Sequence, residues 1–465
     1  MSGTDDSSEQ KQELFRVEQP VGFGVDEYGE YALVPLSMLR GGRLRETKVH
    51  SKPMKHIINT SHPDPRGWYK NKHENDRTRP RPCYSEALLT TPYGGYCPVG
   101  CAFCYVDNGT RGYRSTGLAT ASPDYPEHMA KQLAKIMTTG PAYMSSFTEP
   151  FQLLEGRHHV TQRLSQVFND NGLPFFYLSR KIPPDWAVDA LLVNPYSYMQ
   201  FSINSSDNKL YKRLSPGSFK IDEIMETIRK MSEKGIYISI QCNPVMPGIM
   251  TQEDILTLIG MLGQAGAHHI IFKFAEQVFN QRQLLLDRLM EHKVPRVDAF
   301  DAVFTQKIGG VYTVAQDLRV EWLNAFLEKT RQVGMTMSTC YEYYDDGKAG
   351  ANLAPYFTTS DQCHGRGVPV HARPAPNEPF VPLPGCYRKG CLYCEEYGTK
   401  ACRNEELLQA KALQFSDMKR IVIDPKLLRR EKAWGMKDSC ARPEDARQSV
   451  HGNPGLKTDM EMREE

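Results

Sequence analysis

Apolar residues along the middle of the chain recur with two periods, one typical of helices and one typical of short buried strands. Apolar positions three or four residues apart predict helices. These lie at 129–137 (carrying Met129, Leu133, Ile136 and Met137), at 160–168, just after Pro184, at 221–231 and at 255–262. Short apolar runs between them predict strands. These lie at 87–93, 142–147, 175–178, 198–203, 236–240 and 268–274.

The alternation of strands and helices predicts an α/β fold. Strands separated by helices of about 10–15 residues form parallel sheets with right-handed crossovers. The pattern contains six strand–helix units, which is the number in the open, partial (βα)6 barrel that a family resemblance described below implies. A full barrel of eight units is the alternative, because a long amphipathic helix at 315–333 and a strand at 335–339 follow. In either architecture, the active site is expected at the carboxyl ends of the strands.

Outside this alternating region the chain changes character. Residues 1–14 and 436–465 are polar, and we expect both to be disordered tails. Residues 15–84 form an N-terminal extension, and 85–339 contain the predicted barrel. Residues 340–435 are rich in Gly, Pro and Cys, so this segment needs a stabilising element other than regular periodic packing.

Bulk charge identifies no partner, because the 465 residues carry a net charge of only +2. The charge is unevenly distributed, however. Between Arg40 and Arg81 there are twelve Lys or Arg against four Asp or Glu, interleaved with Trp68 and Tyr69. Such a stretch is suited to lie along a phosphate backbone, and a solvated arm or lid is an equally good interpretation.

The N-terminal residues contain no basic segment followed by an apolar one, so no signal peptide is predicted. No run approaches the ~18 apolar residues of a membrane span. We therefore expect no membrane association and a reducing, cytoplasmic location. There, the twelve cysteines indicate metal or cluster ligands rather than disulfides.

Cys97, Cys101 and Cys104 form a C-x3-C-x2-C loop after the first predicted strand. Three thiolates are one fewer than the four that usually saturate a [4Fe-4S] cluster, which leaves one iron open. A zinc knuckle or three core cysteines is the alternative, but zinc sites favour C-x2-C pairs with a fourth ligand, and no His lies close by. The loop, with aromatic Phe103 before its third cysteine, resembles the signature loop of the radical S-adenosylmethionine (SAM) enzymes.

This resemblance implies both fold and chemistry. It implies a partial (βα)6 radical SAM barrel in which the open iron chelates the amino and carboxylate groups of SAM. An electron from the cluster then splits the sulfonium and gives a 5′-deoxyadenosyl radical. We therefore expect a [4Fe-4S] cluster and SAM as cofactors. A reducing partner such as flavodoxin or ferredoxin is expected as well.

Further runs resemble the spore-photoproduct-lyase-like, or DNA repair photolyase-like, branch of this family. They are SFTEPFQ at 146–152 with Glu155, SRK at 179–181, SIN at 202–204, LSPG at 214–217 and PVMPG at 244–248. Each is weak alone, but they follow successive strands. The resemblance implies that Ser146, Thr148, Arg180, Lys181, Ser202 and Asn204 bind the cofactor. Residues 142–155 lack the cysteine that the lyase uses as a hydrogen-atom donor, which argues against literal spore-photoproduct repair.

A second cysteine group lies beyond the predicted barrel, where Cys386, Cys391 and Cys394 form a C-x4-C-x2-C pattern. With one distant cysteine, such a pattern surrounds a four-iron cluster or a tetrahedral zinc. We predict an auxiliary iron–sulfur cluster with Cys363 as its fourth ligand and Cys402 as a spare. Structural zinc and unliganded thiols remain as alternatives.

Taken together, these patterns indicate a radical SAM enzyme of the isomerase or lyase type. The basic stretch and the branch resemblance favour a nucleobase substrate in DNA, specifically thymine or a modified thymine. One form of this hypothesis is the isomerisation of an amino-acid-decorated thymine, as in phage DNA hypermodification. Peptide or natural-product maturation is the alternative within the family. A nucleic-acid-binding protein with structural metal sites is the alternative outside it.

Overall fold

The chain divides into two compact units, Met1–Ile423 and Asp424–Glu465, and all described residues belong to the first. The computed structural model describes residues 17–37, 43–62, 65, 88–108, 117–308, 310–340, 342–344, 351–360, 363–382 and 412–414. The predicted tails, the residues 66–87, and the cysteines Cys386, Cys391, Cys394 and Cys402 lie outside these ranges.

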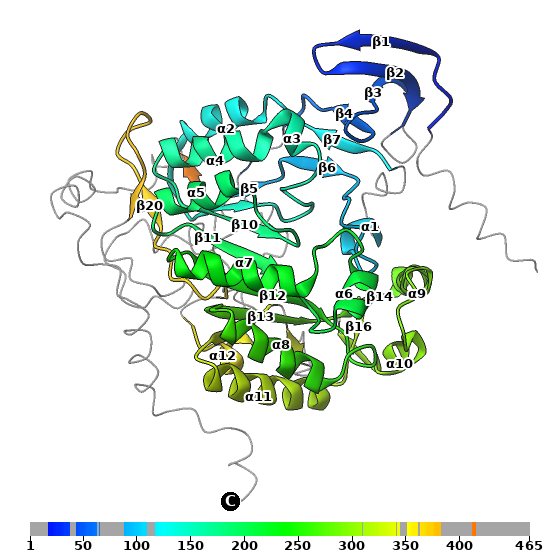
Figure 1. Cartoon of the computed structure of the whole chain (residues 1–465), viewed down its shortest axis with the longest axis vertical. Helices are drawn as coiled ribbons and strands as arrows, with labels where there is room; N and C mark the ends of the chain where they lie inside the picture. The colour runs from blue at the N-terminus through cyan, green and yellow to red at the C-terminus, as the bar shows by residue number, and fades with distance from the viewer. Residues whose placement is uncertain are drawn as a thin grey trace, which may run out of the picture. The chain divides into compact units, whose positions relative to one another are not determined.

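Seven parallel strands form the central sheet, and their order in space follows their order in the chain (Figure 1). From edge to edge they are β5 (Leu88–Thr90), β9 (Ala142–Met144), β10 (Phe175–Ser179), β11 (Tyr198–Ser202), β12 (Tyr237–Val245), β13 (His269–Phe274) and β17 (Thr336–Thr339). All six predicted strands and the strand predicted at 335–339 have a counterpart in this sheet. The described sheet thus has one strand more than the six-unit prediction and one fewer than the eight-unit alternative.

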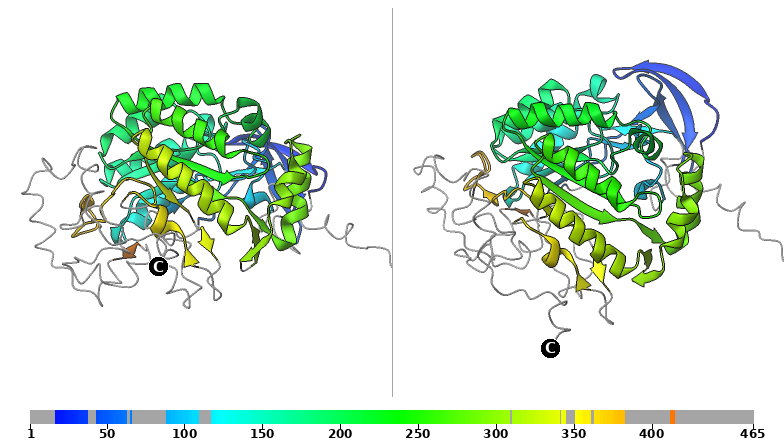
Figure 2. Two further views of the ribbon diagram at one scale, coloured as in Figure 1. Left: turned by 90° about the horizontal axis from the view of Figure 1, so that it is seen from below. Right: turned by 60° about the horizontal axis from the view of Figure 1, so that its bottom comes forward.

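Helices connect consecutive strands and gather along one face of the sheet (Figures 1 and 2). The Thr251 hydroxyl accepts a hydrogen bond from the Asp254 amide, and the Asp254 carboxylate accepts one from the Thr251 amide, which fixes the start of α8. Gly235, at φ +82°, lets the chain turn away after α7. The principal helices are α4 (Val160–Asp170), α5 (Asp185–Val193), α7 (Ile221–Glu233), α8 (Gln252–Gln264) and α11 (Gln316–Gln332).

The two faces of the sheet are covered differently, because side chains alternate along each strand. Phe201 and Phe272 belong to the main hydrophobic core beneath the helices. Phe176 and Tyr198 point to the other face, where the Tyr198 hydroxyl lies 2.9 Å from Nδ1 of His364. The C-terminal segment that carries His364 therefore covers part of the helix-free face, and Figure 2 (left) shows it on the side away from the helices.

A second sheet of six strands contains the N-terminal part of the chain. Its strands, in spatial order, are β1 (Gly22–Asp26), β2 (Gly29–Leu36), β3 (Arg45–His50), β4 (His56–Ile58), β7 (Ala119–Ala121) and β6 (Tyr93–Gly95). The described portion of the basic stretch Arg40–Arg81 thus supplies two strands of a sheet. Sequence periodicity gave no signal for β1 to β4.

The prediction of helical structure at Ile136 and Met137 is wrong. Helix α2 (Tyr125–Leu133) ends earlier, and β8 (Ile136–Thr139) follows it. Strand β8 pairs with β20 (His371–Ala372) and β22 (Leu413–Gln414), and the buried Arg373 donates a hydrogen bond to the carbonyl of Ile136. Pairing with residues more than two hundred positions away overrides the local helical spacing.

The remaining elements are short and border these sheets. The strands are β14 (Glu276–Val278), β15 (Gln306–Ile308), β16 (Val311–Thr313), β18 (Tyr343–Tyr344), β19 (Ala351–Asn352) and β21 (Val381–Pro382). The helices are α1 (Tyr105–Asn108), α3 (Glu155–His158), α6 (Asn208–Leu214), the 3-10 helix η3 (Phe279–Gln281), α9 (Arg282–Glu291), α10 (Val297–Ala302) and α12 (Ala354–Phe357). Within the described part of the chain, no helix combines the length and apolarity that a bilayer crossing requires.

Candidate active site

The cysteine loop runs from β6 to α1 and is hydrogen-bonded to the segment that follows α6. Two turns shape the loop, since the amide of Gly100 donates to the carbonyl of Cys97 and the amide of Cys104 to that of Cys101, each at 3.1 Å. The amide of Ala102 donates to the carbonyl of Leu214 at 2.9 Å. These bonds hold the loop beside the carboxyl end of β11, which precedes α6.

The segment Leu214–Gly217 fits closely against the backbone of the loop. The amide of Gly217 donates to the carbonyl of Val99 at 2.9 Å. A Cβ atom on Gly217 would lie 2.1 Å from the carbonyl oxygen of Pro98, so only glycine fits here. In the same segment, the Ser215 hydroxyl donates a hydrogen bond to the Cys101 sulfur at 3.2 Å.

Arg180 follows β10 and extends its guanidinium between the strand ends and the cysteine loop. It donates to the carbonyl of Ser202 at 3.1 Å and to that of Asn243 at 3.0 Å. Its guanidinium carbon lies 5.0 Å from the centre of the Phe103 ring. Burial lowers the pKa of Arg180, but Cys101 and other neighbours raise it by more, so the group stays charged beside the loop.

Two side chains of the run after β9, Ser146 and Gln152, have buried polar atoms with no hydrogen-bond partner among the described residues. In Ser146 this atom is the hydroxyl oxygen. By contrast, the Thr148 hydroxyl donates to the carbonyl of Tyr93 and lies 3.3 Å from the Ser145 hydroxyl. A buried, unpaired hydroxyl costs free energy unless a ligand or water completes it, so Ser146 is a better candidate than Thr148 for a ligand contact.

The two acidic residues of this run hold the fold together. Glu149 accepts hydrogen bonds from the Ser179 hydroxyl at 2.6 Å and from the Arg180 amide at 3.1 Å. Burial raises the pKa of Glu149, and these bonds oppose that rise. Glu155 accepts from the amides of Thr161 and Gln162, both at 2.9 Å, and so caps the start of α4.

The residues after β11 supply a further unpaired polar atom. Asn204 is fully buried, and its amide nitrogen donates to the carbonyl of Pro244 at 3.2 Å. Its side-chain oxygen has no partner among the described residues. The carbonyl of Ser202 accepts from Arg180 and, at 3.1 Å, from the Tyr211 hydroxyl. The Lys181 amide donates to the Ser179 hydroxyl at 2.8 Å.

The three cysteine thiols of the loop suit an iron–sulfur cluster better than a single metal ion. Among the described residues, no three His, Cys, Asp or Glu side chains gather around one point as a single metal ion requires. A [4Fe-4S] cluster places each thiolate on a different iron, so its ligands need not converge in this way. Cys97, Cys101 and Cys104 are all partly accessible on one short loop, which fits a cluster that must meet a reductant and SAM.

Cys363 contacts the central sheet at β13 and β17. It is buried, and its carbonyl accepts from Nε2 of His269 at 2.9 Å and from the Ser338 hydroxyl at 2.6 Å. His269 begins β13, so Cys363 lies toward the amino ends of the strands, whereas the cysteine loop lies at their carboxyl ends. The other predicted ligands of an auxiliary cluster lie outside the described residues.

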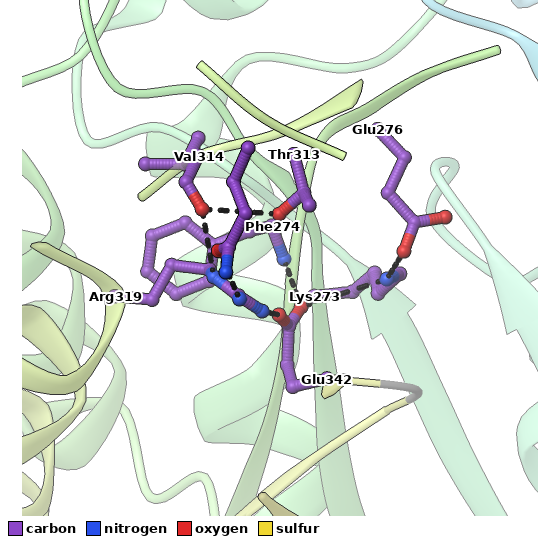
Figure 3. A network of polar contacts seen from close by, with 8 residues as sticks. Lys273, Phe274, Glu276, Thr313, Val314, Arg319 and Glu342 are labelled. Atoms are coloured by element: carbon purple, nitrogen blue, oxygen red, sulfur yellow. Dashed lines mark hydrogen bonds and ion pairs between the residues drawn. The ribbon is translucent and has the colours of Figure 1, made fainter. Parts of the chain in front are cut away.

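A second polar centre, shown in Figure 3, lies at the carboxyl ends of β13 and β17. Glu342 lies 3.0 Å from Nη1 of Arg319 and 3.7 Å from Nζ of Lys273, and it accepts from the Phe274 amide at 2.6 Å. Lys273 also pairs with Glu276. Burial lowers the pKa of Lys273, but Glu342 and Glu276 raise it by more, so the ammonium stays charged.

Sequence reasoning missed this centre. In the sequence, Lys273 and Arg319 look like exposed charges on a strand and a helix, and Glu342 lies in a run of tyrosines and acidic residues that matches no motif. One sequence feature could have indicated this centre. Side chains alternate along β13, so Lys273 points away from the helix-covered core that contains Phe272 and Phe274.

A curated phage protein, the "Radical SAM Nalpha-GlyT isomerase" of Pseudomonas phage M6, is 42% identical over 367 residues, which are 77% of this chain and 76% of that protein. The chain belongs to the radical SAM enzymes. It is an enzyme of the isomerase or lyase type, in a family that works with SAM and a [4Fe-4S] cluster. The alternative of a nucleic-acid-binding protein with only structural metal sites is therefore wrong.

Solved structures of lower similarity include spore photoproduct lyase complexed with dinucleoside spore photoproduct. It is 14% identical with a TM-score of 0.46, covering 61% of this chain and 82% of that chain. Streptococcus suis SuiB bound to precursor peptide SuiA is 15% identical with a TM-score of 0.36, covering 54% of this chain and 47% of that chain. No protein-family model matches the chain.

Proposed function

We propose that this radical SAM enzyme isomerises a thymine that carries an amino-acid substituent, within DNA. The observation that carries the proposal is the 42% identity to a phage enzyme named as an Nα-GlyT isomerase, a name that we interpret as glycyl-thymine. An isomerase rearranges one molecule and needs no second substrate. The absence of a cysteine between 142 and 155 agrees with this proposal, since a hydrogen-atom donor of the lyase kind is not needed there.

Cys97, Cys101 and Cys104 are the proposed ligands of the catalytic cluster. When bound, the reduced cluster and SAM supply a 5′-deoxyadenosyl radical that abstracts hydrogen from the substrate. The protein holds the loop through backbone hydrogen bonds with Leu214 and Gly217, so the three thiols are positioned before a cluster binds. Positioning of this kind is the contribution a protein makes to cofactor chemistry.

The six predicted cofactor-binding residues contribute unequally to the proposed SAM site. Ser146 and Asn204 offer buried polar atoms with no partner among the described residues, which supports direct contact with SAM. The Thr148 hydroxyl already donates to the carbonyl of Tyr93, and the Ser202 carbonyl already accepts from Arg180. Arg180 is committed to two backbone carbonyls, which leaves Lys181 as the better candidate for the SAM carboxylate.

Mass spectrometry of nucleosides tests the isomerisation. The reconstituted protein is incubated anaerobically with SAM, a reductant and DNA that contains Nα-glycyl-thymine, and the DNA is then digested to nucleosides. The expected result is loss of the substrate nucleoside and the appearance of a product of identical mass at a different retention time. DNA with unmodified thymine is the control. A product of different mass, or conversion of a peptide instead, contradicts the proposal.

Recognition of DNA rests on the basic stretch Arg40–Arg81. A base within a duplex must leave the stack to reach a radical, and cationic contacts to the flanking phosphates stabilise that arrangement. Removing one cation that binds a phosphate should flatten the log–log salt dependence of binding by about 0.9. The triple variant Arg77→Ala, Arg79→Ala, Arg81→Ala should show this flattening, and Arg229→Ala on α7 should not. Binding that does not depend on salt favours a free nucleoside as substrate.

An auxiliary cluster on Cys363, Cys386, Cys391 and Cys394 is also proposed. It predicts about eight irons per chain after anaerobic reconstitution, and about four when the first loop carries three Ala substitutions, because a four-iron cluster takes four ligands. Zinc in place of the second four irons would identify a structural site instead. A flavodoxin or ferredoxin as reductant and a cytoplasmic location stay predictions.

A further inference from the structure

Cys101 receives a hydrogen bond from the Ser215 hydroxyl at 3.2 Å, although the two residues are 114 positions apart. Ser215 is fully buried, so water does not compete for this hydroxyl. The sequence drew attention to Ser215 only as part of the LSPG run at 214–217.

The backbone around Ser215 is fixed from both sides. Its amide donates to the carbonyl of Tyr211 at 2.8 Å. Its carbonyl accepts from the Ser218 hydroxyl at 2.6 Å, and Lys212 donates to the carbonyl of Ser218 at 2.6 Å. Because these contacts set the backbone, the Ser215 hydroxyl is directed at the Cys101 sulfur in advance of any ligand.

The guanidinium of Arg180 adds a full positive charge to the same place. It is held by the carbonyls of Ser202 and Asn243, stacks over Phe103 in the cysteine loop, and interacts electrostatically with Cys101 and Cys104. A buried cation acts more strongly on a neighbouring anion than an exposed one, because the surrounding medium screens it less.

We propose that Ser215 and Arg180 are positioning residues that raise the reduction potential of the cluster at Cys97, Cys101 and Cys104. The inference rests on the proposed function, which places the catalytic cluster on this loop. Reduction moves one electron from a low-potential flavodoxin or ferredoxin onto the cluster and breaks no bond. The added negative charge spreads onto the cysteine sulfurs, where a hydrogen bond and a nearby cation stabilise it.

An anaerobic redox titration, followed by the electron paramagnetic resonance signal of the reduced cluster, tests this proposal. The chemical probes are dithionite and redox mediators, so no substrate is required. In Ser215→Ala, the ratio of reduced to oxidised cluster at a fixed potential should fall about tenfold, which corresponds to about 59 mV for one electron. The iron content of the variant should match that of the wild type.

Ser232→Ala on α7 is the control, because it removes a serine hydroxyl that donates to the carbonyl of Gly266 at 3.0 Å and takes no part in the contacts that set the Ser215 backbone. Its midpoint potential should equal that of the wild type. An unchanged potential in Ser215→Ala with full iron content, or an equal shift in both variants, overturns the role of Ser215.

A second pair of variants tests the role of Arg180. It keeps the proposal testable if Ser215→Ala binds too little cluster for a titration. Arg180→Lys keeps the charge, whereas Arg180→Gln removes it. The midpoint potential should fall more in the Gln variant, and equal potentials in the two would overturn the role of the charge. If the catalytic cluster does not lie on this loop, replacing Cys97, Cys101 and Cys104 with Ala would leave the full signal of the reduced cluster. That result contradicts the proposed function, whereas an unchanged potential in Ser215→Ala contradicts only the role of Ser215.

Discussion

Just beyond β9 and β11, the Ser146 hydroxyl and the side-chain oxygen of Asn204 are buried without a partner among the described residues. At the carboxyl ends of β13 and β17, by contrast, the buried charges of Arg319 and Glu342 lie against each other, and the partly buried Lys273 lies beside them. Both regions occupy the edge of the sheet where active sites of such folds lie. The first region leaves neutral polar atoms without a partner among the described residues. The second pairs its charges and so holds two strands and a helix together, while the Thr339 hydroxyl at the end of β17 has no partner among the described residues either.

This difference shows that a strongly polar cluster is not by itself evidence for a binding site. Charges that are buried and mutually paired require their partners, so they fix local structure. Unpaired polar atoms of no net charge are the better sign of a missing ligand, because leaving them unsatisfied costs free energy. Four predictions test this division, in order of decreasing effect.

Replacing Cys97, Cys101 and Cys104 together with Ala should abolish the formation of 5′-deoxyadenosine from SAM under reducing, anaerobic conditions. The thiols lie on a partly accessible loop, so the fold should survive. Chromatography of the reaction products gives the first readout and circular dichroism the second. Cleavage of SAM at the wild-type rate in a folded triple variant would remove the loop from the candidate active site.

Glu342→Gln should lower the free energy of unfolding by about 3–5 kcal/mol, since it leaves the buried Arg319 cation without its carboxylate partner and removes one of the two carboxylates beside Lys273. Glu276→Gln is the control, because the Glu276 side chain is 35% exposed and should matter far less. Urea unfolding measures both. If Glu342→Gln keeps wild-type stability but loses activity, the second polar centre is a ligand site and the comparison fails.

Gly217→Ala should disturb the cysteine loop, because the new methyl group would overlap the carbonyl of Pro98, and backbone cannot rotate away as a side chain can. A cost of about 1–3 kcal/mol is typical of such overpacking. Iron content after reconstitution should fall, while α/β structure is retained. Gly156→Ala, which meets no atom within 4 Å, should load iron normally. Full loading of Gly217→Ala would show that the loop is not held tightly.

Ser146→Ala should weaken SAM binding about tenfold, as expected when one hydrogen bond to a ligand is removed. It should leave the free energy of unfolding within about 0.5 kcal/mol of the wild type, because the hydroxyl bonds to no described protein atom. The neighbouring Ser145→Ala removes a contact to Thr148 and should do the reverse. Equilibrium dialysis with SAM and urea unfolding separate the two outcomes, and equal SAM affinities would argue against Ser146 as a ligand contact.

The periodic pattern was sufficient for the central sheet because each strand is buried on both faces and so forms a short apolar run. It failed where long-range pairing decides local structure, as at Ile136, whose strand forms only with partners from the C-terminal part of the chain. It also gave no sign that the segment carrying His364 would cover the helix-free face against Phe176. Contacts of that kind leave no period in the sequence.

The sequence by itself determined the family, because the spacing of Cys97, Cys101 and Cys104 and the order of the strand-end motifs reflect local geometry and chemistry. Only the tertiary structure decided which polar residues are free to meet a ligand. It directs Ser215 at Cys101 and pairs Arg319 with Glu342, and it leaves the Ser146 hydroxyl without a partner among the described residues. The physical reason is that hydrogen-bond satisfaction depends on every neighbour in space, and those neighbours come from distant strands whose approach no local pattern encodes.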